Sequence, residues 1–148
     1  MIFRDLTEEE FCSFQELLCS HFEIEIKDFY LDFKAIDLIC QDVSLVSYDK
    51  AYKLNGLNEN TIPINEIHFY SKTKKSEIYF LIKHFRNCGS HYHRIKIAEE
   101  NNVRYLLFKD ATKAYTSMIA IIEDELFYKF YNYILSEANS KKTNKIPK

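Results

Sequence analysis

The sequence has few residues that break helices, with only two Gly and two Pro among 148 residues, and it contains no Trp. So few breakers disfavour a sandwich or barrel with many strands and turns, and they favour long helices. Hydrophobic residues make up 47% of the chain, which is enough to build a core, and the length is typical of one domain. We therefore expect a single, mainly helical domain over residues 1–138, followed by a disordered, polar and basic tail over residues 139–148.

Long apolar runs and paired cysteines are also absent. No segment reaches the roughly 18 uninterrupted apolar residues that a membrane span requires, and the first residues lack the basic start and apolar stretch of a signal peptide. The four cysteines form no CxxC pair, which is typical of reduced thiols in the cytosol. We therefore expect a cytoplasmic protein with no membrane partner.

The spacing of apolar residues predicts most of the elements. Thr7 and Glu10 have the spacing of a capping box, and the apolar residues after them predict a first helix over residues 7–21. The same helical spacing predicts further helices over residues 27–42, 76–89 and 112–137.

Two other stretches have different patterns. Residues 94–97 and 103–108 can extend and pair with each other, and the turn-like Asn101 and Asn102 lie between them, which predicts a small β-hairpin. Between residues 43 and 73 the pattern is weaker and allows only a short helix and turns.

Acidic residues are missing between Glu77 and Glu99, although in the whole chain they outnumber Lys and Arg by 22 to 20. Such a stretch favours an anion site, because nothing negative competes with a bound phosphate. A solvated basic face would have the same composition, and charge alone does not decide between the two interpretations. The candidate RNA-binding residues of this stretch are Lys83, His84, His93, Arg94 and Lys96.

The same stretch contains Arg86, Asn87 and His91, which have the chemistry for cutting RNA without a metal. A histidine can transfer a proton during attack by the 2′-hydroxyl, and an arginine can hold the phosphate oxygens and offset their growing charge. On a regular helix Arg86 and His91 would be about 500° apart in rotation and would point in different directions. Gly89 lies between them, and a last turn loosened there would bring them together. An Arg and a His at a helix end also commonly cap carbonyl groups, so the residues alone leave that interpretation open.

The sequence Arg86-Asn87-x-x-x-His91 resembles the R-N-x-x-x-H motif of the HEPN superfamily, and the hairpin and helix expected after it resemble a group of bacterial HEPN nucleases. The resemblance covers residues 78–137. It implies a HEPN-like helical bundle with a small β-hairpin before the C-terminal helix. It also implies a metal-independent endoribonuclease in which Arg86 and His91 are catalytic and Asn87 supports them.

The resemblance carries further expectations about partners and regulation. HEPN nucleases commonly form homodimers in which two motifs meet, and many act as toxins or phage-defence effectors. We therefore expect RNA as the substrate, a homodimer, and a neutralising antitoxin as a further partner. Tyr92 stands where a glycine commonly follows the histidine. His93 stands where toxins silenced by nucleotidylation carry a tyrosine, so we do not predict that regulation.

Other functions use the same residues differently. A non-catalytic module of the same fold would bind RNA or a nucleotide without cutting it, and an interaction module would use its many tyrosines as a partner surface. Cys88, His91 and His93 are zinc-ligand types, but no fourth ligand has a fitting spacing, so we predict no metal. We also predict no cofactor, because no phosphate-binding glycine motif is present. Nothing in the sequence favours Cys88 as a nucleophile over a buried thiol.

Overall fold

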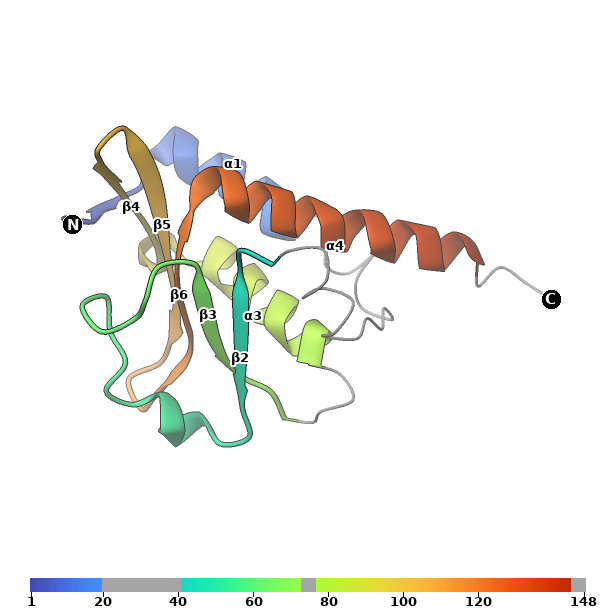
Figure 1. Cartoon of the computed structure of the whole chain (residues 1–148), viewed down its shortest axis with the longest axis horizontal. Coiled ribbons are helices and arrows are strands. Elements are labelled where there is room, and N and C mark those ends of the chain that lie inside the picture. The colour runs from blue at the N-terminus through green and yellow to red at the C-terminus, as the bar shows by residue number, and fades with distance from the viewer. Residues whose placement is uncertain (20–40, 73–76, 145–148) are drawn as a thin grey trace.

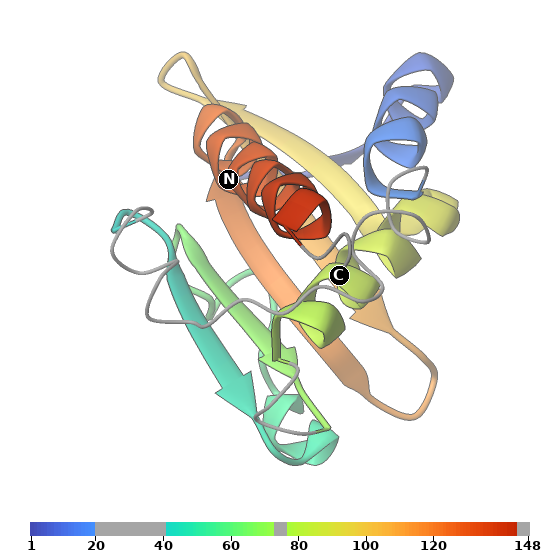
Figure 2. The ribbon, with the colours of Figure 1, turned by 90° about the vertical axis from the view of Figure 1, so that its right-hand side faces the viewer.

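The protein is built around a six-stranded mixed sheet with helices on one of its faces (Figures 1 and 2). The computed structural model describes residues 1–19, 41–72 and 77–144, with residues 137–144 described by their backbone alone. The order of the strands across the sheet is β1-β4-β5-β6-β3-β2, and β2 and β3 are parallel while all other neighbours are antiparallel. The strands are β1 (Arg4–Asp5), β2 (Ser44–Tyr48), β3 (Glu66–Tyr70), β4 (Ile95–Glu100), β5 (Val103–Ala111) and β6 (Thr116–Glu123).

In the part of the chain that the structure describes, three α-helices and two short 3-10 helices are placed around this sheet. Figure 2 shows the three α-helices in front of the strands. None of the helices described is both long and apolar enough to cross a membrane. The helices are α1 (Glu8–Cys19), η2 (Ala51–Leu54), α3 (Glu77–Ser90), η4 (Tyr92–Arg94) and α4 (Asp124–Asn144).

The predicted mainly helical bundle is wrong, because the sheet is the central layer of the protein. The clearest error concerns residues 112–137, which are not one helix but the strand β6 followed by α4. Both faces of β6 are covered, so five consecutive residues, 118–122, are buried. A strand buried on both faces is apolar throughout and lacks the alternation that distinguishes a strand from a helix.

Several local predictions are confirmed. The first helix is α1, and the Thr7 hydroxyl accepts a bond from the Glu10 N–H while the Glu10 carboxylate accepts one from the Thr7 N–H. The predicted hairpin is β4–β5. Its two-residue turn uses Asn101 and Asn102, whose φ angles of 54° and 66° suit a left-handed hairpin turn.

The other expectations have mixed outcomes. The predicted helix over residues 27–42 lies almost entirely outside the described residues. The weak region after it contains β2, η2 and β3 instead of one short helix. At the other end of the chain, α4 continues to Asn144, past the start of the predicted tail.

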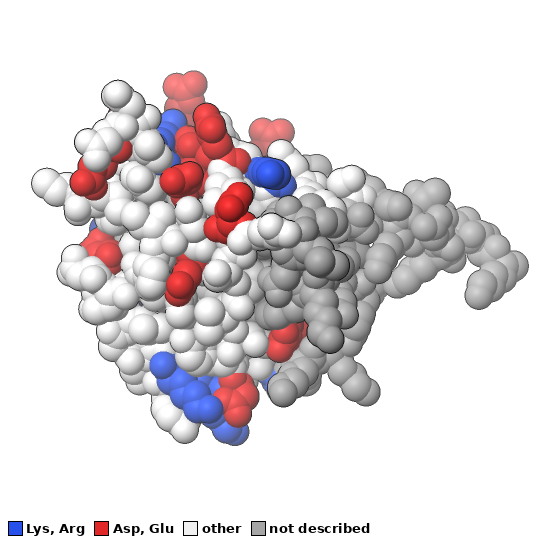
Figure 3. Space-filling model, in the orientation of Figure 1, with Lys and Arg blue, Asp and Glu red and all other residues white. Residues whose placement is uncertain are grey.

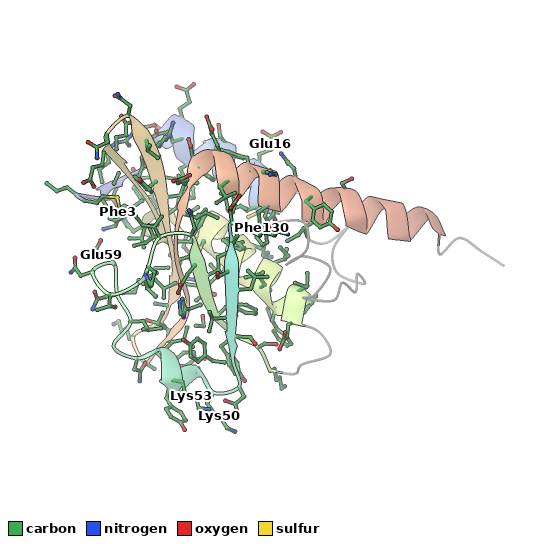
Figure 4. All side chains as sticks on the ribbon, viewed as in Figure 1. Phe3, Glu16, Lys50, Lys53, Glu59 and Phe130 are labelled. Atoms are coloured by element: carbon green, nitrogen blue, oxygen red, sulfur yellow. The ribbon has the colours of Figure 1, made fainter. Side chains whose placement is uncertain are left out.

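The sheet separates two cores. The larger core lies between the sheet and the three helices, where Phe130 of α4 is buried (Figure 4). The smaller core lies on the opposite face, where Ile62 of the loop before β3 contacts Leu107, Ile119 and Ile121. Adjacent residues of β5 and β6 therefore belong to opposite cores, and the side of the sheet that a residue faces decides its chemistry.

Gly89 is a contact point between α1 and α3. It lies inside α3, which continues regularly to Ser90, so the expected loosening of the last turn is wrong. A side chain at this position would begin with a Cβ only 3.0 Å from the Cβ of Leu18 and 3.3 Å from the Sγ of Cys19. The glycine therefore permits the close approach of two helices.

We expect Gly89→Val to lower the free energy of unfolding by about 2 kcal/mol, because overpacking costs more than the modest gain in helix propensity returns. The matched control is Lys83→Val, which places the same side chain on the exposed face of the same helix. Urea unfolding of both variants measures the difference. Equal stability of the two variants would contradict the close-packing role of Gly89.

Candidate functional site

Three side chains from the stretch without acidic residues contact the carboxylate of Asp110, which lies on β5 and is 4% exposed. Its Oδ2 atom is 2.9 Å from Nδ1 of His84 and accepts a 3.1 Å hydrogen bond from the Asn87 side chain. Its Oδ1 atom accepts a 2.6 Å hydrogen bond from Nη1 of Arg94. We call these four residues the Asp110 cluster. It joins α3, η4 and β5.

The two ring nitrogens of His84 both face hydrogen-bond acceptors. Nδ1 faces the Asp110 carboxylate, and Nε2 lies 2.7 Å from the backbone oxygen of Tyr70. A carbonyl and a carboxylate can only accept, so the ring satisfies both contacts only when both nitrogens carry a proton. Both ring nitrogens of His84 are thus aimed at acceptors, and the Arg94 guanidinium contacts the other oxygen of the Asp110 carboxylate.

The environment of Asp110 lowers the pKa of its carboxyl below the ordinary value. Burial acts in the opposite direction and raises this pKa, because it disfavours the charged form. The hydrogen bonds from His84 and Asn87, together with the charges of His84 and Arg94, outweigh the burial. Asp110 is thus an ionised carboxylate held by its neighbours.

The three predicted catalytic residues have different surroundings. Asn87 belongs to the Asp110 cluster. Arg86 is half-buried on α3, and its backbone oxygen accepts a 2.9 Å hydrogen bond from Ser90. His91 lies beyond the end of the helix with an exposed ring, and no residue that the structure describes hydrogen-bonds that ring. The described hydrogen bonds and ion pairs therefore do not join Arg86 to His91 within one chain.

A basic hollow of about 130 Å³ lies on the face of the sheet opposite the helices. Three of the predicted RNA-binding residues line it, namely His93, Arg94 and Lys96. Lys109 of β5 adds a fourth basic side chain. The remaining lining residues are Asn58, Glu59, Leu107 and Ile119.

The other two predicted RNA-binding residues lie elsewhere. His84 is buried in the Asp110 cluster, and Lys83 is exposed on α3 outside the hollow. The structure thus gathers part of the predicted set and adds a lysine that the sequence analysis missed.

Carboxylates partly offset the charge of the basic hollow. Asp5 of β1 lies 3.3 Å from Nδ1 of His93 and 3.9 Å from the Lys96 ammonium, and all three side chains are at least 40% exposed. Such exposed pairs are weak. Lys109 forms no ion pair with any residue in the described part of the chain. A bound phosphate would therefore meet the lysine Lys109, the two loosely paired groups of His93 and Lys96, and the guanidinium of Arg94, with the carboxylate of Glu59 as the opposing charge of the lining.

The remaining sequence candidates do not form a second site. Within the described ranges, no three His, Cys, Asp or Glu side chains gather as metal ligands, and this includes Cys88, His91 and His93. Burial, and then the charge of Asp110, raise the pKa of the Cys88 thiol well above its ordinary value. A fully buried, protonated thiol is a poor nucleophile.

A scan against family models and searches of curated proteins and of solved structures found no match. These comparisons neither support nor oppose the HEPN resemblance. The function is therefore inferred from the side chains of this chain.

Asp110 and Lys109 are the site residues that the sequence analysis missed. One signal was present, since Leu106, Phe108 and Asp110 have the period of two that places them on one face of a strand. A carboxylate in line with two buried apolar residues requires a partner. Its partners at His84 and Asn87 are three positions apart, which is the spacing of one helix face.

We expect Asp110→Asn to lower the free energy of unfolding by about 3 kcal/mol at pH 7, because it leaves the Arg94 guanidinium without its anion and weakens the buried hydrogen bonds of His84 and Asn87. The folded pKa of Asp110 is depressed, so its stabilisation is fully present above the ordinary carboxyl pKa of about 4. It is lost as the pH falls through the lower, folded pKa. Urea unfolding of both proteins from pH 7 to acid should therefore show the difference shrinking below about pH 4.

The exposed carboxylate Glu59 provides the control, and Glu59→Gln should change stability little at any pH. A difference between wild type and Asp110→Asn that stays constant into strong acid would show that the charge of Asp110 does not stabilise the fold.

Proposed function

We propose that this protein is a non-catalytic RNA-binding module that holds the phosphate backbone at the basic hollow. The observation that carries the proposal is the convergence of His93, Arg94, Lys96 and Lys109 around one hollow. His93, Arg94 and Lys96 are neighbours in the sequence, and the pairing of β4 with β5 brings Lys109 into the same region.

The size and chemistry of the hollow support a phosphate as the group it holds. Its volume of about 130 Å³ is well below the several hundred Å³ that drug-sized ligands require, but a phosphodiester group is smaller than such ligands. Arginine and lysine are the usual donors to phosphate oxygens, and such contacts fix a nucleic acid without reading its sequence. We therefore propose binding to single-stranded RNA with little sequence preference.

Binding without cleavage is supported by the way the predicted catalytic residues are used. The Asn87 side chain donates to the buried Asp110 carboxylate, and the ring of His91 lies exposed beyond the end of α3. The ribonuclease, the homodimer and the antitoxin stay predictions of the HEPN resemblance. The ribonuclease differs from the proposed binding module in one measurable respect, the dependence of RNA cleavage on His91.

We expect the double variant Lys96→Ala, Lys109→Ala to bind single-stranded RNA roughly tenfold more weakly at low salt, because it removes two phosphate contacts. The slope of log affinity against log salt should become shallower by about 1.4. Fluorescence anisotropy of a labelled oligonucleotide measures both quantities. Lys83→Ala, which removes an exposed lysine outside the hollow, is the control and should change neither.

We expect Asp5→Asn to strengthen RNA binding a few-fold, because it removes the carboxylate that competes for His93 and Lys96. The same anisotropy titration measures the change, with Asp49→Asn as the control because Asp49 pairs with Lys53 instead. Unchanged affinity of Asp5→Asn would place the RNA away from this hollow.

One assay separates binding from cutting. Total RNA is incubated with wild type and with His91→Ala in the presence of a chelator, and the ends of any fragments are analysed. We expect no cleavage by either protein. Cleavage by wild type alone, with cyclic-phosphate ends, would replace the proposal with the ribonuclease.

A further inference from the structure

A second hollow lies at the other edge of the sheet, where the parallel strands β2 and β3 end. Its volume is about 350 Å³, within the range of small-molecule sites. Its polar lining includes Ser47, Tyr48, Asp49, Lys53, Lys72 and Glu77. We call it the β2–β3 pocket. Figure 4 labels Lys53, on η2, at this end of the molecule.

The hydrogen bonds among the lining residues fix which groups can accept. The Ser47 hydroxyl donates to Oε1 of Glu77 at 3.1 Å, so its oxygen can only accept further bonds and the second carboxylate oxygen of Glu77 stays available. Oδ1 of Asp49 accepts a 2.7 Å bond from Lys53 and leaves its other oxygen as an acceptor. This part of the pocket thus favours a ligand group that donates hydrogen bonds.

The hydroxyl of Tyr48 is also committed as a donor. His68 is 9% exposed, and its Nε2 lies 2.9 Å from the Glu66 carboxylate, which can only accept. In the tautomer that carries its proton on Nε2, the Nδ1 atom accepts the Tyr48 proton, across 2.7 Å. Burial, and then the charge of Glu66, raise the pKa of Tyr48, so the phenol keeps that proton. Its oxygen can offer a ligand only lone pairs.

Among the lining residues that the structure describes, positive and negative charges are equal in number and lie next to each other. Two carboxylates, Asp49 and Glu77, face two ammonium groups, Lys53 and Lys72. Lys53 is already paired with Asp49, whereas Lys72 pairs with no described carboxylate. Figure 3 shows cationic and anionic side chains next to each other at this lower end of the molecule. A ligand with one cationic and one anionic end and no net charge complements such a lining.

An aromatic base is less well matched to the pocket. Bases in protein sites usually stack on an aromatic side chain. Tyr48 is the only aromatic residue among the described lining residues, and its ring is stacked against His68, with centroids 5.8 Å apart and planes at 30°. One of its faces is therefore already covered.

We infer that the β2–β3 pocket binds a small zwitterion of the α-amino acid class. Its ammonium group donates to Glu77 and the Ser47 oxygen, and its carboxylate binds Lys72. This site is separate from the basic hollow, and it does not depend on the proposed RNA binding.

The experiment is a titration of the full chain, labelled with nitrogen-15, with L-leucine, L-glutamine, L-glutamate and L-lysine up to about 20 mM, a range suited to weak ligands. We expect at least one of them to shift the amide signals of residues 47–49 and 77 in a saturable way. The N-trimethyl form of the binder keeps the positive charge but has no N–H donor, and it should bind at least tenfold more weakly.

Protein variants test the assigned contacts. Glu77→Gln keeps an oxygen for Ser47 but removes the charge, and it should weaken binding roughly tenfold. Lys72→Gln should also weaken binding. Glu125→Gln is the matched control, since Glu125 lines a different hollow beside Arg104 and Asp124. All three variants should keep the RNA affinity of wild type.

Four outcomes would overturn the inference. The first is the absence of any saturable shift at residues 47–49 and 77. The second is equal binding of the trimethylated analogue, and the third is unchanged binding by Glu77→Gln. The fourth is tighter binding of a nucleoside monophosphate at the same amides, which would assign the pocket to nucleotides.

Discussion

The position of α3 on the sheet depends on one buried carboxylate, that of Asp110. A charge in the interior destabilises a protein by several kcal/mol unless partners and hydrogen bonds compensate for it. Here the compensation comes from two side chains of α3 and one of η4. A shift of α3 along the sheet would separate His84 and Asn87 from the carboxylate and leave it only Arg94 among these partners. The end of α3 and the start of β4 are therefore fixed together, with Arg94 as the connection.

This constraint also organises the opposite face of the sheet. Side chains of consecutive residues in a strand point to opposite sides, so Asp110 faces the helices while Lys109 faces the basic hollow. The pairing of β4 with β5 brings Lys96 next to Leu107 in the same region. Arg94 serves both sides, since it binds Asp110 and lines the hollow. A change at the buried cluster would thus move a group that lines the basic hollow.

Local features of the fold could be predicted from the sequence, and features that depend on distant partners could not. The capping box of Thr7 and Glu10 and the turn at Asn101 and Asn102 involve only neighbours in the chain, and both are confirmed. The strands β2, β3 and β6 acquire their pairing from residues far away in sequence. In β6 the burial of both faces also removed the alternation that would have identified a strand. The same division holds for the site, where His93, Arg94 and Lys96 were predicted but Lys109 and Asp110 were not.

The positive charge between Glu77 and Glu99 can pair with carboxylates of the protein itself or with an external anion, and the sequence could not separate these two uses. Some of the basic side chains pair with carboxylates of the protein itself. Asp110 binds His84 and Arg94, and Asp5 lies beside His93 and Lys96. An excess of charge within a segment therefore does not measure its capacity for an external anion. That capacity is what remains after the internal pairs are subtracted, and here it is concentrated at the exposed Lys109 and the loosely paired Lys96. Since buried pairs are held far more tightly than exposed ones, an external anion would compete with Asp5 for its partners but not with Asp110.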